Sequence, residues 1–216
     1  MSFAQTILGI LSNLENTFHP NELAYLAVTS KVEGPIRDRI AYGLHNQVGE
    51  GLLVHREWKD KHDRWTDISI TDEQIRPQCL IELKAHSGPT FESGYSGKMR
   101  KDLHKLYMAG EEDTELYLIF LFNHIYHPGN IDVRYRYAIK YFALQNYASK
   151  KCGFVPDASI ETQTHWEKHL TNNSLMTDKS QMGIRINGGQ YYNMPVAVHV
   201  YLYGPIFRKE LTRMFP

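Results

Sequence analysis

The residue types most able to do chemistry in this chain are an aspartate and a Glu-x-Lys triplet, each inside an apolar segment typical of a β-strand. Asp67 lies in the segment 64–70, and Glu82 and Lys84 lie in the segment 79–85. Because side chains alternate along a strand, Glu82 and Lys84 share one face. Charged side chains in an apolar strand are costly unless they are paired or bind metal. These groups, brought together on neighbouring strands, would form a divalent-cation site beside a fixed positive charge.

Such a site has the equipment to hydrolyse a phosphodiester bond. The reaction needs an activated water and neutralisation of the charge on the phosphate and the leaving oxygen, and a bound Mg²⁺ supplies both. Mg²⁺ takes one or two carboxylates and keeps water and substrate oxygens in its other positions. We expect Asp67 and Glu82 to bind the metal, with the Leu83 carbonyl as a third ligand and Mn²⁺ as a substitute ion. Lys84 is expected to orient the attacking water or to stabilise the phosphate charge.

The elements that must position these residues follow from apolar periodicity and from turn residues. The sequence predicts helices over four segments: 3–16, 21–29, Pro35 to about Gln47, and 98–109. It predicts strands over four segments: 52–58, 64–70, 78–85 and 115–122. The first two strands are joined by a short polar segment, which indicates a hairpin.

The C-terminal part is harder to interpret. A further helix is expected over 134–151, a hairpin turn at Asn187-Gly188-Gly189, and a strand over 196–203. The order of elements indicates an α/β sandwich with a central mixed β-sheet flanked by helices. The length of 216 residues suits a single domain, with a core at about 32–122 and a C-terminal elaboration at about 131–216.

The order of a helix, a hairpin carrying Asp67, a strand carrying Glu82 and Lys84, and a second helix resembles the PD-(D/E)xK nuclease superfamily. Its members include restriction endonucleases, Holliday-junction resolvases and repair nucleases. Thr66 stands where the family motif has proline. The resemblance implies a restriction-endonuclease-like fold and a Mg²⁺-dependent deoxyribonuclease, of the restriction type, that cuts within DNA. A chain of this length would suit an enzyme that acts as a homodimer.

Many members of this superfamily carry a glutamate on the helix before the hairpin, and two interpretations of Glu33 stay open. Glu33 extends the spacing of the apolar residues of that helix, so it could point inward as a catalytic residue that tunes the water or a second ion. Alternatively, Ser30 and Glu33 have the spacing of a capping box. Pro35 weakens this alternative, because a helix that started at Ser30 would hold a proline in its interior.

Two basic helices are candidates for nucleic-acid binding. Lys98, Lys101 and Lys105 recur at helical spacing after the Glu-x-Lys strand and could contact phosphates. Arg134 and Arg136 alternate with tyrosines and could bind phosphate while the rings stack on bases. The alternative for the second group is a solvated helix face whose aromatic residues pack inward.

Composition limits the partners without identifying them. The formal net charge is zero, which gives no global sign of nucleic-acid binding, although local patches remain compatible with it. No apolar run is long enough to span a membrane, and the two cysteines suit a reducing compartment, so we expect a cytoplasmic protein with no membrane partner. Nucleic acid is the expected partner, DNA rather than RNA. Two rival hypotheses stay open: a catalytically inactive nuclease-fold module that binds nucleic acid or a protein, and an interaction protein in which the Glu-x-Lys triplet occurs by chance.

Overall fold

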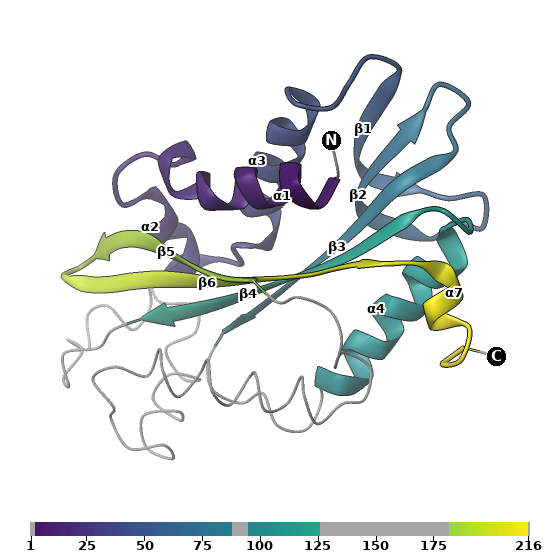
Figure 1. Ribbon diagram of the computed structural model, residues 1–216. Helices are drawn as coiled ribbons and strands as arrows, with labels where there is room; N and C mark the ends of the chain where they lie inside the picture. Colours follow the sequence, from purple (N-terminus) through teal and green to yellow (C-terminus); the bar gives the residue numbers. More distant parts are fainter. Residues whose placement is uncertain (1–2, 88–94, 126–181, 216) are drawn as a thin grey trace.

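The computed structural model describes residues 3–87, 95–125 and 182–215, and its centre is a six-stranded mixed sheet (Figure 1). The strand order across the sheet is β1-β2-β3-β4-β6-β5. The strands are β1 (Leu52–Lys59), β2 (Trp65–Asp72), β3 (Pro77–Ser87), β4 (Glu115–Ile125), β5 (Met182–Tyr191) and β6 (Met194–Ile206). The helices are α1 (Phe3–Ser12), η1 (Leu14–Thr17), α2 (Glu22–Thr29), α3 (Glu33–His45), α4 (Tyr95–Ala109) and α7 (Arg208–Leu211).

The sheet is mixed because of one pair of strands. β1, β2 and β3 form an antiparallel meander, whereas β3 and β4 run parallel. Parallel neighbours need a crossover connection, and α4 lies in it. β6 is antiparallel to β4 and to β5. The expected mixed α/β class is therefore confirmed, and the C-terminal strands β5 and β6 belong to the same sheet, beside β4.

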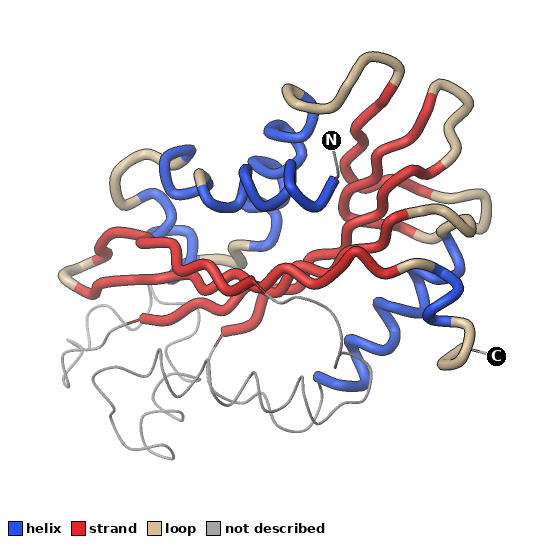
Figure 2. The backbone as a smooth tube through the Cα atoms, viewed as in Figure 1, coloured by secondary structure: helices blue, strands red, loops and turns tan. Residues whose placement is uncertain are grey.

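Helices cover both faces of this sheet (Figures 1 and 2). Helices α1, α2 and α3 pack on one face, where Ile81 and Leu83 of β3 belong to their hydrophobic core. Helix α4 packs on the other face, where Leu80 meets Leu103 and Leu106. Odd-numbered residues of β3 therefore face α1–α3, and even-numbered residues face α4, as strand alternation requires.

Helix α3 confirms the predicted helix before the hairpin, but it begins two residues earlier than expected, at Glu33. Its predicted apolar stripe is buried, with Ile36, Ile40 and Leu44 all fully covered. Pro35 lies in the first turn, where the backbone N–H has no partner within the helix and a proline costs little. The start at Glu33 carries this side chain toward the sheet.

The predicted hairpin turn at Asn187-Gly188-Gly189 is wrong. Strand β5 continues through this segment to Tyr191, with a shift in its register to β6 between Asn187 and Gly189. Gly189 has φ +85°, and a Cβ there would lie 2.5 Å from the Asn21 side chain, so the glycines accommodate an irregular strand against α2. The turn instead falls at Tyr192, whose φ is 48°, and the residue after it.

The predicted helix over 134–151 lies outside the described residues. In the part of the chain that the structure describes, no helix combines the length and the apolar character that crossing a membrane requires.

Candidate functional site

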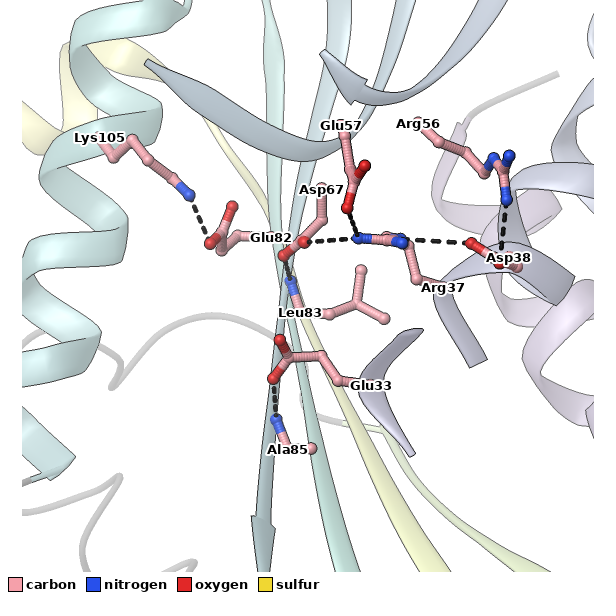
Figure 3. A network of polar contacts seen from close by, with 10 residues as sticks. All are labelled: Glu33, Arg37, Asp38, Arg56, Glu57, Asp67, Glu82, Leu83, Ala85 and Lys105. Carbon is pink, nitrogen blue, oxygen red and sulfur yellow. Dashed lines mark hydrogen bonds and ion pairs between the residues drawn. The ribbon is translucent and has the colours of Figure 1, made fainter. Parts of the chain in front are cut away.

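The site lies where strands β2 and β3 separate. Their pairing ends at Ile68↔Ile81, although β3 continues to Ser87 along β4. Two backbone N–H groups of β3 that would face β2 are bound by carboxylates instead. Leu83 N–H donates to Asp67 Oδ2 and Ala85 N–H donates to Glu33 Oε2, each at 2.8 Å (Figure 3). Residues from α3, β2 and β3 are thus gathered at one opening of the sheet.

The Leu83 carbonyl lies on the same side of β3 as this pair of bonds. In a strand, the N–H and C=O of one residue point toward the same neighbouring strand. Because the Leu83 N–H points to Asp67, the Leu83 carbonyl also points to the side that β2 has left. This direction agrees with the expected role of Leu83 as a backbone ligand.

Glu82 lies on the α4 face of β3 and is 5% exposed. Its Oε1 forms an ion pair with Lys105 of α4, while its Oε2 is buried and has no hydrogen-bond partner among the described residues. Burial, reinforced by the charge of Asp67, raises the pKa of Glu82 to about 8 despite the opposing effect of Lys105. A buried carboxylate in this condition would be stabilised in its ionised form by a cation.

Lys84 lies one step along the same face and is about one-third exposed. Its Nζ is 3.4 Å from Asp102 Oδ2 on α4. Burial alone would lower the pKa of Lys84, but the charges of Asp102, Glu33 and Glu82 outweigh it and raise the pKa. Lys84 is therefore held as an ammonium group among three acidic side chains.

The second oxygen of Asp67 faces an arginine that the sequence analysis missed. Asp67 Oδ1 is 3.7 Å from Arg37 Nη1, and the same nitrogen donates to Glu57 Oε1 at 2.8 Å. Figure 3 shows Arg37 reaching from α3 between these two carboxylates. One signal for it was present, because Arg37 follows Glu33 by four residues, and this spacing places both on one side of a helix.

The capping-box alternative for Glu33 is wrong. The residue that precedes helix α3 is Val32, and no side chain in the described part of the chain caps the helix. Ser30, the proposed capping residue, donates its hydroxyl to the Leu26 carbonyl of the preceding helix. The Glu33 carboxylate reaches Ala85 instead because the helix begins at Glu33 itself.

The expected phosphate-binding lysines of α4 do not share one environment. Lys101 is exposed, whereas Lys105 is largely covered and paired with Glu82. The side chain of Lys98 lies outside the described residues, as do Arg134 and Arg136. Of the predicted contacts to nucleic acid, the structure therefore places only Lys101 on an open surface, and it places Lys105 beside the carboxylates.

The donors at this opening fit Mg²⁺ by type. No group of three or more His, Cys, Asp or Glu side chains arranged to hold a metal occurs within residues 3–87, 95–125 and 182–215. A Mg²⁺ site needs only one or two carboxylates, because water and substrate fill its other positions. Asp67, Glu82 and the Leu83 carbonyl make such a set, and the unpartnered Glu82 Oε2 is an available oxygen.

Comparisons of this chain with protein-family models, with curated proteins and with solved structures gave no match.

Proposed function

We propose that this protein is a Mg²⁺-dependent deoxyribonuclease with a restriction-endonuclease-like, PD-(D/E)xK-type core. The observation that supports the proposal is the gathering of Glu33, Asp67 and Lys84 around β3 next to Glu82. Asp67 accepts a hydrogen bond from the Leu83 N–H, and Glu33 accepts one from the Ala85 N–H. Two carboxylates drawn from α3 and β2 to one short segment of β3, beside Glu82 with its raised pKa, support a role in metal-dependent phosphodiester hydrolysis.

In this proposal each residue has a distinct task. Asp67, Glu82 and the Leu83 carbonyl hold the metal, which when bound lowers the pKa of a water molecule and withdraws charge from the phosphate. Lys84 remains protonated, because of its acidic neighbours, and orients the nucleophile or binds a phosphate oxygen. Glu33 accepts a hydrogen bond from the Ala85 N–H, while its second oxygen, for which the described residues give no hydrogen bond, would bind water.

The test is cleavage of supercoiled plasmid with Mg²⁺ or Mn²⁺. Asp67→Ala, Glu82→Ala and Lys84→Ala should each abolish cleavage and leave the fold intact. Glu73→Ala is the matched control, because Glu73 is an exposed acid in the turn at the other end of β2. Only the first two variants should lose Mn²⁺ binding in calorimetry, since lysine is not a ligand. Full cleavage by Asp67→Ala would remove the nuclease activity from this site.

The choice of DNA as substrate and a homodimeric assembly also belong to the proposal. A dimer would cut both strands, so linear product should form with little nicked intermediate. Sedimentation at micromolar concentration gives the assembly state directly. A single-stranded RNA of matched length is the control substrate, and preferential cleavage of it would reverse the choice.

One observation favours a second candidate function, a catalytically inactive module that binds nucleic acid or a protein. Each proposed metal-ligating carboxyl group already faces a cation of the chain, since Lys105 pairs with Glu82 and Arg37 faces Asp67. Such a site would be stable without metal. DNA retention in a mobility-shift assay, with no cleavage in Mg²⁺ or Mn²⁺ and no heat of Mn²⁺ binding, would favour this function.

A further inference from the structure

Glu57 has a backbone conformation that is uncommon within a strand. Its φ is 52°, in the left-handed region that residues with a side chain seldom adopt. The pairs on either side of it in the β1–β2 ladder place it opposite Asp67. Strain of this kind persists only where the surroundings hold it, and it gathers at functional sites.

The Glu57 side chain holds an arginine that in turn faces Asp67. Arg37 Nη1 donates to Glu57 Oε1 at 2.8 Å and lies 3.7 Å from Asp67 Oδ1. Arg37 Nε also donates to Asp38 at 3.3 Å, and the arginine side chain is only 17% exposed. The guanidinium is thus fixed by two hydrogen bonds while its contact to Asp67 remains longer than a hydrogen bond.

We propose that Glu57 and Arg37 are positioning residues for Asp67, an inference that rests on the proposed function. Leu83 N–H binds one oxygen of the Asp67 carboxylate, and Arg37 directs the other oxygen, so the plane of the group is set from both sides. The long contact to Arg37 leaves Oδ1 available to a ligand.

The alternative is that Glu57 and Arg37 only tie α3 to β1. The two roles predict different measurements, because a contact that only connects α3 with β1 affects the stability of the fold alone. A positioning role affects the Asp67–Leu83 hydrogen bond, and hydrogen exchange at the Leu83 amide reports on this bond without any need for activity. The Ala85 amide, which Glu33 binds, is an internal control in the same strand.

The decisive variant is Glu57→Gly, which removes the carboxylate and also relieves the strained φ. The melting temperature should therefore not fall, because this relief offsets the loss of an ion pair whose carboxylate is largely exposed, and Arg37 keeps Asp38 as a partner. Exchange at the Leu83 amide should become roughly tenfold faster and that at Ala85 should not change. The kcat for plasmid cleavage should fall about tenfold, with unchanged DNA affinity in Ca²⁺.

Ile75→Gly is the matched control. Ile75 also has a positive φ, 62°, and it is exposed in the turn between β2 and β3, so glycine relieves similar strain far from the site. It should leave kcat and the Leu83 amide unchanged. Arg37→Met, which keeps the apolar stem without the charge, should reproduce the faster Leu83 exchange.

Wild-type Leu83 protection in both Glu57→Gly and Arg37→Met would overturn the positioning role, whatever the rates. A wild-type protein that cuts no DNA would instead overturn the proposed function. In that case the amide exchange still decides whether Glu57 and Arg37 position Asp67.

Discussion

Binding of a divalent cation at this site should release a proton from Glu82. Burial and the charge of Asp67 raise the pKa of this carboxyl group to about 8, so it is largely protonated at neutral pH. A carboxylate must lose its proton to bind a metal ion. From a pKa of about 8, binding should release nearly one proton at pH 6.5 and only a small fraction of a proton at pH 9.

Calorimetric titration with Mn²⁺ measures this release. The observed heat is recorded at each pH in two buffers with different ionisation enthalpies, and its dependence on the buffer gives the number of protons. The affinity for Mn²⁺ should rise about tenfold for each pH unit between 5.5 and 7.5, and it should level off above the pKa of Glu82.

Glu82→Gln is the matched control, because it keeps the size of the side chain and removes the titrating group. This variant should bind Mn²⁺ more weakly, with little dependence on pH and no proton release. Lys84→Ala should retain the release, since it removes no ligand. If wild-type protein binds Mn²⁺ at pH 6.5 without releasing a proton, or if Glu82→Gln releases as many, Glu82 is not the ligand inferred here.

Three further outcomes follow from the same contacts. In the folded protein Glu82 keeps its proton up to about pH 8, whereas in the unfolded chain it loses the proton near pH 4.5, so the stability present below about pH 4.5 is lost as pH rises through about 8. Glu82→Gln should therefore resist urea better than wild type at pH 9, by on the order of a few kcal/mol, and equally well at pH 4.5. Asp102→Asn should lower the pKa of Lys84 and shift the alkaline limb of the kcat profile to lower pH. Glu33→Gln should slow cleavage by more than any loss of stability explains, as paired rate and denaturation measurements would show.

The strands and the shared face of Glu82 and Lys84 were predictable from sequence. Alternation along a strand has a period of two, so the apolar Ile81 and Leu83 determine which face Glu82 and Lys84 occupy. Burial of these apolar residues on the α1–α3 side bears this out.

The opening between β2 and β3 was not predictable in this way. A hydrophobic pattern indicates that two segments are strands, but it does not indicate where their pairing ends. Here it ends at Ile68↔Ile81, and this fact decides that the Leu83 N–H is available to a side chain. For the same reason the turn predicted at Asn187-Gly188-Gly189 was wrong. The sequence does not show the strand register, and glycines at an irregularity within β5 have the same sequence pattern as a hairpin turn.

The charges of α4 show a further limit of sequence reasoning. Lys105 and Asp102 are three residues apart and share a face of the helix, while Glu82 and Lys84 are two apart and share a face of the strand. Either periodicity alone predicts a charged face, and a row of lysines is the simple interpretation. In the structure each charge instead meets its opposite across the two elements. That pairing depends on how α4 crosses β3, and it determines both the pKa of Lys84 and which oxygen of Glu82 is left for a metal ion.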